Sequence, residues 1–262
     1  QGIGPFAAQL VAFAGAMFGL VTADDLMVLF VFWEITSVLS FLLIGYSGHR
    51  IFARRSAIQA LIVTTFGGLA MLVGLVMLGN AAGTFRISGV LEAAPELLGS
   101  TTVDVALVLI LAGAVSKSAL FPTHFWLPAA MAAPTPVSAY LHAAAVVKAG
   151  IYVLLRFSAV FRLNLTWQIL LVVIGMFTAV MGALFALQKT DLKKLLAYST
   201  VSQLGWIVAT IGVGTPFAIG AALVHTLAHA LFKSSLFMLI GVVDHEAGSR
   251  DMRRLGPIYN KM

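Results

Sequence analysis

Eight stretches of this sequence are each long enough for a membrane-crossing helix and carry almost no charge. A bilayer core requires about 20 apolar residues per helical crossing. The windows lie at 5–22, 26–46, 56–79, 104–121, 137–157, 165–187, 194–213 and 216–243. Only 10% of all residues are charged, against about 25% in soluble domains. Because lipid offers no hydrogen bonds to the backbone, we predict an all-α, polytopic transmembrane bundle of about eight spans.

The composition also excludes several classes of protein. Eight spans leave no room in 262 residues for a second, water-soluble domain. The absence of cysteine excludes disulfides, thiolate metal sites, iron–sulfur clusters and covalently attached haem. We therefore predict no cofactor site and no metal site. The chain begins at Gln1 and enters an apolar segment without a signal-peptide pattern, which indicates a fragment or a processed piece.

The basic residues predict how the bundle is oriented. If the helices alternate in direction, ten of the sixteen basic residues share one side: Arg50, Arg54, Arg55, Lys189, Lys193, Lys194, Arg250, Arg253, Arg254 and Lys261. The other side holds Arg86, Arg156 and Arg162 with the acids Asp24, Asp25, Glu92, Glu96 and Asp104. The positive-inside rule then places the first side in the cytoplasm.

Four ionisable residues fall inside predicted spans: Glu34, Lys117, Lys148 and Lys233. On insertion scales each such group at a helix centre costs about 2.5 to 3.5 kcal/mol when it faces lipid. Four of them would cost about 10 to 14 kcal/mol, which rivals the stability of a whole domain, about 5 to 15 kcal/mol. We therefore expect all four to face the interior of the bundle, one another, or water.

A proline-rich segment follows Lys117 and predicts a broken helix. Half of the eight prolines lie between positions 122 and 136. Pro122 removes a backbone donor and clashes with the preceding turn, so it should interrupt the span. Broken helices at membrane depth line cavities or sites, whereas a kink within a packed helix is the alternative.

Three histidines lie in the spans that carry Lys148 and Lys233. His142 and Lys148 are six residues apart, which places them on different faces of one helix. His225, His229 and Lys233 follow each other at intervals of four and form one stripe. The pattern favours a line of proton-binding groups, with a polar packing seam or a metal site as alternatives; the His-x-x-x-His pair lacks the glutamate of zinc proteases.

Three long segments resemble one known family. They are DLMVLFVFWEITSVLSFLLIGY from Asp25, KSALFPTHFWLPAAMAAPTPVSAYLHAAAVVKAGIY from Lys117, and HTLAHALFKSSLFM from His225. They are similar to the proton-conducting antiporter-type subunits shared by respiratory complex I and the Mrp multisubunit cation/proton antiporters. Within that family the resemblance is greatest to the large A subunit of Mrp antiporters, and the large membrane subunits of complex I come next.

The resemblance implies a set of roles and an internal repeat. It implies that Glu34 pairs with Lys117, that His142 and Lys148 bridge, and that His225, His229 and Lys233 lead toward a second half-channel. Members are built from two inverted five-helix repeats. Residues 1–157 would form the first repeat completely, and residues 158–262 would supply three helices and a cytoplasmic tail of the second. A weak echo joins Asp25-Leu26, nine residues before Glu34, to Asp191-Leu192, nine before Thr200.

The expected function is therefore that of a secondary-transporter subunit rather than an enzyme. It would carry H⁺ along a buried Glu/Lys/His line in exchange for Na⁺ or another monovalent cation, without a cofactor, in the prokaryotic inner membrane and beside other antiporter subunits. One alternative is a proton-pumping subunit of complex I, NADH-quinone oxidoreductase. Another is a haem-bearing membrane anchor with His142 and His225 or His229 as axial ligands.

Overall fold

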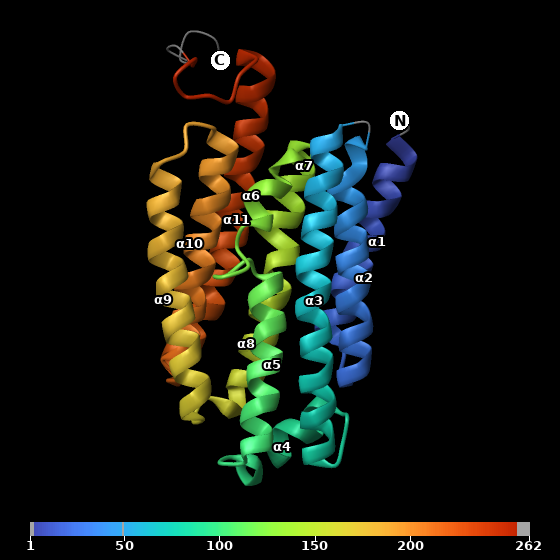
Figure 1. Ribbon diagram of the computed structural model, residues 1–262, viewed down its shortest axis with the longest axis vertical. Coiled ribbons are helices and arrows are strands. Elements are labelled where there is room, and N and C mark those ends of the chain that lie inside the picture. The colour runs from blue at the N-terminus through green and yellow to red at the C-terminus, as the bar shows by residue number, and fades with distance from the viewer. Residues whose placement is uncertain (1–2, 49, 256–262) are drawn as a thin grey trace.

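The computed structural model describes residues 3–48 and 50–255, and in this part of the chain long helices stand side by side as one bundle (Figure 1). The helices are α1 (Ile3–Thr22), α2 (Leu26–Ile44), α3 (Ile51–Ala82), α4 (Ile87–Leu97), α5 (Thr101–Lys117), α6 (Trp126–Ala129), α7 (Thr135–Val137), α8 (Val146–Phe161), α9 (Leu165–Leu187), α10 (Leu192–Gly212) and α11 (Pro216–Ala247). A π-helical segment, Ser138–Ala145, joins α7 to α8. The predicted all-α transmembrane bundle is confirmed.

Seven helical stretches in the described residues are long and apolar enough to cross a membrane. The eighth predicted span, at 104–121, corresponds to α5, which has 17 residues and ends at Lys117. It is shorter than predicted because the chain leaves the helical conformation well before Pro122: Ala119 has a φ of 51°. The predicted helix break is therefore present, and it begins immediately after the lysine.

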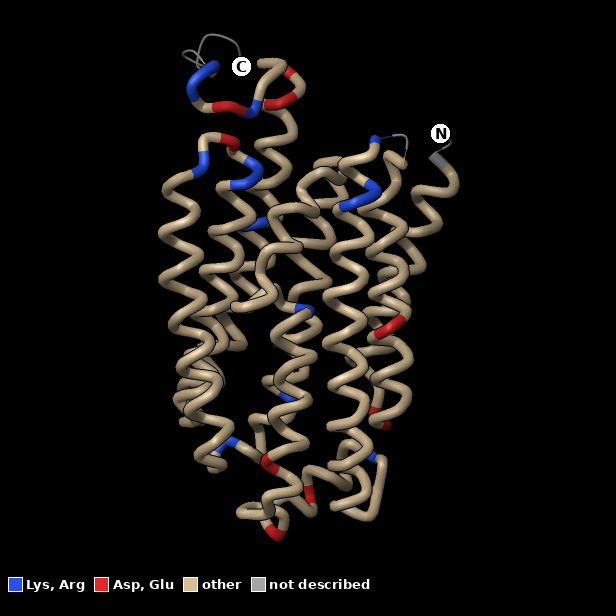
Figure 2. The backbone as a smooth tube through the Cα atoms, viewed as in Figure 1, with Lys and Arg blue, Asp and Glu red and all other residues tan. Residues whose placement is uncertain are grey.

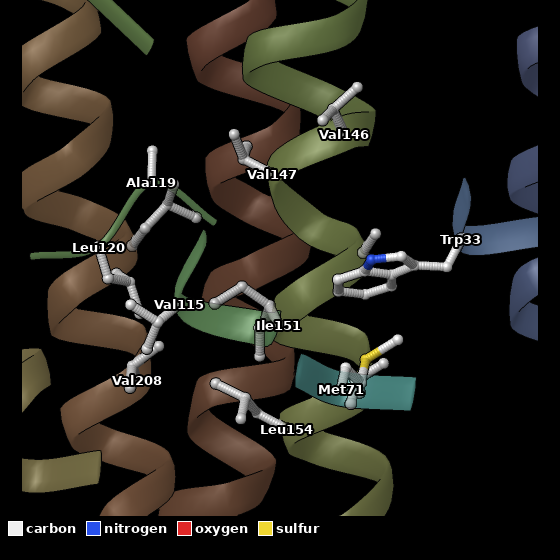
Figure 3. Packing of buried hydrophobic residues seen from close by; sticks show 14 of the residues in the cluster. Trp33, Met71, Val115, Ala119, Leu120, Val146, Val147, Ile151, Leu154 and Val208 are labelled. Atoms are coloured by element: carbon white, nitrogen blue, oxygen red, sulfur yellow. The ribbon is translucent and has the colours of Figure 1, made fainter. Parts of the chain in front are cut away.

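Close contacts between small residues hold neighbouring helices together. A Cβ atom added at Gly175 of α9 would lie 2.4 Å from the backbone nitrogen of Ala209 in α10. Such backbone contacts suit a medium in which hydrophobicity does not drive helices together. In the centre, side chains from five helices meet, among them Trp33, Met71, Val115, Ile151 and Val208 (Figure 3). The outer surface is also apolar, as expected for a lipid-facing bundle.

The charged residues lie mainly at the two ends of the bundle, and most Lys and Arg residues gather at the end where α3 and α10 begin (Figure 2). Several of these basic residues lie in the first turns of helices. Arg54 and Arg55 belong to the first turns of α3. Lys193 lies in the first turn of α10 with a relative exposure of 1%, a burial that the sequence analysis does not predict. Lys261 lies outside the described residues.

Two short connections have the same backbone pattern. At the start of α2, the Leu26 N–H donates to the Phe85 carbonyl at 2.9 Å, just beyond the end of α3. At the start of α10, the Leu192 N–H donates to the Arg250 carbonyl at 3.0 Å, just beyond the end of α11. The first connection lies at the lower end of the bundle and the second at the upper end (Figure 1). The three helices α1–α3 and the three helices α9–α11 therefore run in opposite directions.

Candidate functional site

Lys117, the last residue of α5, is fully buried in the centre of the bundle. Its Nζ donates to the Trp33 carbonyl at 2.6 Å and to the Ser37 hydroxyl at 2.7 Å, both in α2. The same amine lies 4.7 Å from the centroid of the Trp33 ring. An ammonium can remain in the low-dielectric interior only with such partners. These three contacts are all with uncharged groups.

The broken segment after Lys117 supplies the hydrogen bonds that the interrupted helix loses. The Trp126 indole N–H donates to the Ser116 carbonyl at 2.8 Å, and the Thr123 hydroxyl donates to the Val115 carbonyl at 3.2 Å. The same carbonyls also accept backbone hydrogen bonds, from the Ala119 N–H to Ser116 at 3.4 Å and from the Leu120 N–H to Val115 at 3.0 Å, so the last turn before the break remains satisfied at membrane depth. The Phe121–Pro122 peptide bond is cis.

Glu34 lies one residue beyond Trp33 on α2, next to the small residue Gly68 of α3. A Cβ atom at Gly68 would stand 2.1 Å from its Oε1. Glu34 and Lys117 interact electrostatically, but the ion pairs within 4 Å in the described residues all lie at the bundle ends. The pairing implied by the family resemblance is therefore a charge interaction across a gap, because the Lys117 amine is turned toward the Trp33 carbonyl.

Lys148 connects the first half of the molecule to α11. Its Nζ lies 2.6 Å from Nδ1 of His229 and 2.5 Å from the Ala143 carbonyl. The carbonyl belongs to the π-helical segment, whose wider turns change the residues that face one another. Both Lys148 and His229 are buried. The structure therefore brings together two predicted site residues that are 81 positions apart.

His142 lies in the same π-helical segment and faces a different neighbour, as predicted. It is fully buried, and its ring meets the Trp126 ring edge-on at 6.1 Å. Neither of its ring nitrogens has a hydrogen-bond partner among the described residues. Because buried polar groups are almost always hydrogen-bonded, a water molecule is the natural partner of His142.

The predicted stripe on α11 faces α10 and α8. His225 lies 2.9 Å from the Gln203 side-chain oxygen, through Nε2. Its ring stacks on that of His229 with 6.4 Å between centroids. Lys233 donates from Nζ to the Ser199 hydroxyl at 2.8 Å. The stripe thus consists of proton-binding groups with polar partners.

Sequence reasoning missed one buried cation. Lys193 donates from Nζ to the Ala133 carbonyl at 2.5 Å, and its charge acts on His142. A signal was present in the sequence, since Leu196, Ala197 and Thr200 follow at three, four and seven residues and are all buried. This spacing places Lys193 on the inward face of the helix.

These groups lie within an apolar bundle, where Lys117 bonds to α2 beside Glu34 and Lys148 contacts His229 of the α11 stripe. Lysine, histidine and glutamate can each hold or release a proton, and burial makes every protonation state sensitive to neighbouring charges. In the described residues, no group of three or more His, Cys, Asp or Glu side chains is arranged to hold a metal ion. The chemistry that these residues can perform is proton transfer.

Comparisons with known proteins show the family to which the chain belongs. Residues 23–262 match the family model described as "NADH:quinone oxidoreductase/Mrp antiporter, TM". The chain is 49% identical to the probable A/B subunit of a K⁺/H⁺ antiporter from Rhizobium meliloti, over 98% of this chain and 26% of that protein. It is 47% identical to the A subunit of a Na⁺/H⁺ antiporter from Bacillus subtilis, over 97% of this chain and 33% of that protein.

Two solved structures are similar to the fold. The Mrp complex from a Dietzia species matches with a TM-score of 0.88 and 54% identity, over 91% of this chain and 26% of that chain. The membrane-bound sulfane sulfur reductase, an archaeal respiratory membrane complex, matches with a TM-score of 0.84 and 31% identity, over 93% of this chain and 51% of that chain. The chain thus spans only about a quarter to a third of the length of the antiporter relatives.

Proposed function

Since the chain belongs to the family of membrane subunits shared by NADH:quinone oxidoreductases and Mrp antiporters, we propose that it is part of the large A subunit of a multisubunit cation/proton antiporter. It translocates H⁺ in exchange for Na⁺ or another monovalent cation, in the prokaryotic cell membrane and beside the other subunits of the complex. Its relatives are named as Na⁺/H⁺ or K⁺/H⁺ antiporter subunits, which supports transport over enzymatic conversion of a substrate.

The contact between Lys148 and His229 carries this proposal. It joins a base on the first half of the molecule to a base on α11 at 2.6 Å, within hydrogen-bond distance for a proton to pass. On its other side, Lys148 follows Val147, whose carbonyl accepts a hydrogen bond from the hydroxyl of Ser118, the residue after Lys117, at 2.8 Å.

Charge coupling along the line supplies the mechanism. A proton that arrives at Lys117 repels protons on the next groups and strengthens its attraction to Glu34. The proposed line consists of Glu34, Lys117, His142, Lys148, His225, His229 and Lys233. Water molecules complete it at His142, whose nitrogens have no protein partner among the described residues.

The repeat division belongs to the same proposal. Residues 1–157 form a complete five-helix unit that contains the broken helix near Pro122, and residues 158–262 form the first three helices and the tail of an inverted second unit. The matching connections before α2 and α10, at opposite ends of the bundle, support this division.

A pair of variants tests the proposed path. In vesicles that contain the full antiporter complex, Lys148→Met and His229→Asn should each reduce sodium-dependent proton movement at least about tenfold, measured by fluorescence dequenching of a pH-sensitive dye. The double variant should be no worse than either single one, because both remove the same connection. His245→Asn is the matched control, since that ring is exposed at the end of α11. Full activity in Lys148→Met would overturn the proposal.

The similarity to an archaeal respiratory complex favours one alternative, in which a redox reaction elsewhere drives the same line of residues. The subunits that copurify with the full-length protein distinguish the two. Small antiporter subunits support the antiporter, whereas flavin or iron–sulfur subunits support the alternative.

A further inference from the structure

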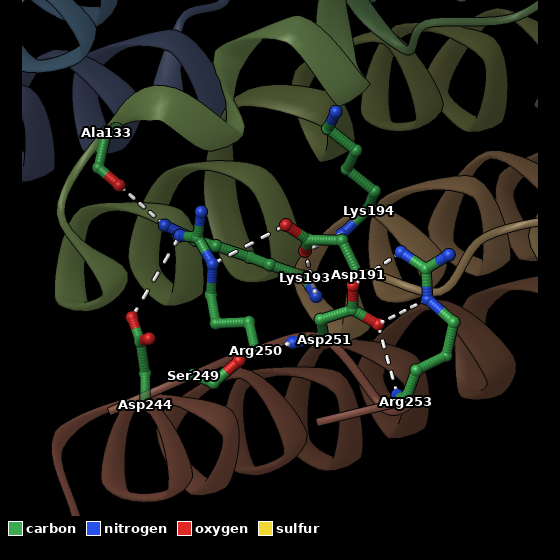
Figure 4. A network of polar contacts seen from close by, with 9 residues as sticks. All are labelled: Ala133, Asp191, Lys193, Lys194, Asp244, Ser249, Arg250, Asp251 and Arg253. Carbon is green, nitrogen blue, oxygen red and sulfur yellow. Dashed lines mark hydrogen bonds and ion pairs between the residues drawn. The ribbon is translucent and has the colours of Figure 1, made fainter. Parts of the chain in front are cut away.

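A basic cavity lies at the end of the bundle where α3 and α10 begin, away from the buried line. It has a volume of about 220 Å³. Four cationic side chains line it, from three parts of the chain that are distant in sequence: Arg50 before α3, Lys193 and Lys194 in α10, and Arg250 after α11. Figure 4 shows the last three of these around Asp191.

The carboxylate in this lining does not neutralise the four cations. Asp191 caps α10, and its Oδ1 accepts hydrogen bonds from the backbone N–H groups of Lys193 and Lys194. Its Oδ2 lies 3.5 Å from the Arg250 guanidinium, which also reaches Asp244 at 4.0 Å. Arg50 and Lys194 are exposed. The cavity therefore keeps an excess of positive charge and free N–H donors, which suits an anion.

The remaining wall of the cavity is apolar and reaches the lipid-facing surface. It includes Phe52, Pro128 and Met131, and Phe52 is 62% exposed. A cavity for a free, hydrated ion does not need such a wall. A cationic pocket beside an apolar surface, at the level where the chain leaves the membrane, matches a phospholipid headgroup.

A second, apolar groove lies below the first cavity along the same face of α3. Val63, Phe66 and Ala70 line it together with residues of α5 and α9, and its volume is about 430 Å³. At 3.6 residues per turn, these three residues and Phe52 fall within about 60° of one another. Val63 is about 16 Å below Phe52 along the helix, close to the thickness of one leaflet, about 15 Å. An acyl chain that descends from the cavity reaches the groove.

We propose that these two cavities form a site for one acidic phospholipid, with its phosphate among Arg50, Lys193, Lys194 and Arg250 and an acyl chain along α3 toward the groove. The net positive lining selects lipids with a net negative headgroup over zwitterionic ones. The lipid would hold the start of α3 against α10, and therefore would link the two halves of the molecule at this end.

Native mass spectrometry tests the site directly. The full-length protein, with its associated subunits, is extracted from a membrane of phosphatidylethanolamine and phosphatidylglycerol, and the retained lipids are counted. The Arg50→Gln/Lys194→Gln variant should lose at least about two-thirds of the retained phosphatidylglycerol, because two of four cations are removed. The control, Arg55→Gln/Arg254→Gln, removes equal charge at the same end but outside the cavity lining and should retain the lipid. Equal retention in both variants, or equal loss, would overturn the proposal.

Two further measurements separate the lipid from a free anion. Ala70→Phe places a ring in the apolar groove and should lower retention of the lipid without any change of charge. Inorganic phosphate added to the delipidated protein should raise its melting temperature less than phosphatidylglycerol does. Saturation by phosphate alone, with no added effect of lipid, would contradict a lipid site. None of these readouts depends on transport.

Discussion

The α1–α3 unit and the α9–α11 unit are built alike and point in opposite directions. In each, the second helix begins at an aspartate N-cap, Asp25 or Asp191, that accepts hydrogen bonds from two backbone N–H groups. In each, the third helix has 32 residues and ends at a left-handed glycine, Gly83 with φ 69° and Gly248 with φ 66°. Glycine suits both ends because other residues rarely adopt this conformation.

The units differ in the residues that occupy the space between their second and third helices. Counting back from the left-handed glycines, Lys233 of α11 corresponds to Gly68 of α3; counting from the N-caps, Thr200 of α10 corresponds to Glu34 of α2. The first unit therefore places its ionisable group on the second helix and leaves room on the third. The second unit does the reverse, and the Lys233 amine bonds to Ser199.

This comparison shows that the scaffold holds one buried ionisable group in each unit and that either helix can supply it. The sign of the charge is then free to differ, with a carboxylate in one unit and an ammonium in the other. Because the space beside this position is occupied by the Glu34 carboxylate next to Gly68 in one unit and by the Lys233 side chain in the other, substitutions there should affect the two units differently.

The largest effect is expected when the buried ionisable groups are removed. Sodium-dependent proton movement in vesicles with the full complex should fall at least about tenfold in each of three variants, Lys117→Met, Lys233→Met and Glu34→Ala. Methionine keeps most of the side-chain volume, so assembly, measured by subunit copurification, should be retained. Lys189→Met is the surface control. Unchanged dequenching rates in Lys117→Met would remove Lys117 from the path.

A smaller effect is expected when the space at Gly68 is filled. The added Cβ of Gly68→Ala would lie 2.1 Å from the Glu34 carboxylate and must displace it, which changes its interaction with Lys117. We expect a several-fold lower transport rate. Gly220→Ala in α11 is the matched control, because its Cβ would have no neighbour within 4 Å. Alanine also favours helix by about 1 kcal/mol, so a loss of activity in both variants would indicate a general effect of helix stiffness.

The two N-caps should contribute similar stability to their units. Asp25→Ala and Asp191→Ala each remove two hydrogen bonds to free N–H groups, at a cost of about 1 kcal/mol in the free energy of unfolding. Asp25→Asn keeps a capping oxygen and should lower the free energy of unfolding much less. Thermal unfolding in detergent measures the difference. If the alanine and asparagine variants unfold at the same temperature, capping is not what stabilises these connections.

The smallest effect concerns pH at the two connections. The Ser88 hydroxyl and N–H bond to Asp24 and hold the pKa of that carboxyl below its usual value. The Arg253 guanidinium bonds to Asp251 and lowers its pKa to about 2. A lowered pKa stabilises the folded state above the unfolded-state value and loses this contribution as pH falls through the folded-state value.

The stabilisation by Asp251 should therefore be complete above about pH 5 and disappear between about pH 4 and pH 2. The melting temperature of Asp251→Asn should lie below that of the unchanged protein at about pH 6 and approach it as the pH falls. A constant gap down to the lowest pH would mean that Asp251 acts by packing instead of charge.

Helices and their break were accessible from the sequence because they depend on local properties. Apolar length determines the spans, Pro122 predicts the interruption, and the basic residues predict which end of the bundle faces the cytoplasm. The face that each helix turns toward its neighbours could not be predicted in the same way. Most spans are apolar on all sides, so the pattern does not show which face meets a neighbour. Lys193 was missed for a related reason, since helix ends are the least certain part of a prediction.

The sequence by itself determined that this chain is a membrane bundle, which residues are costly to bury, and that the helix bearing Lys117 is broken. Only the tertiary structure decided that Lys148 meets His229, that the Lys117 amine binds Trp33 and Ser37 rather than Glu34, and that Lys193 lies in the interior. Burying a charge has a high cost wherever it lies, which composition reveals. Its partner depends on how helices pack, and packing is a property of the whole bundle.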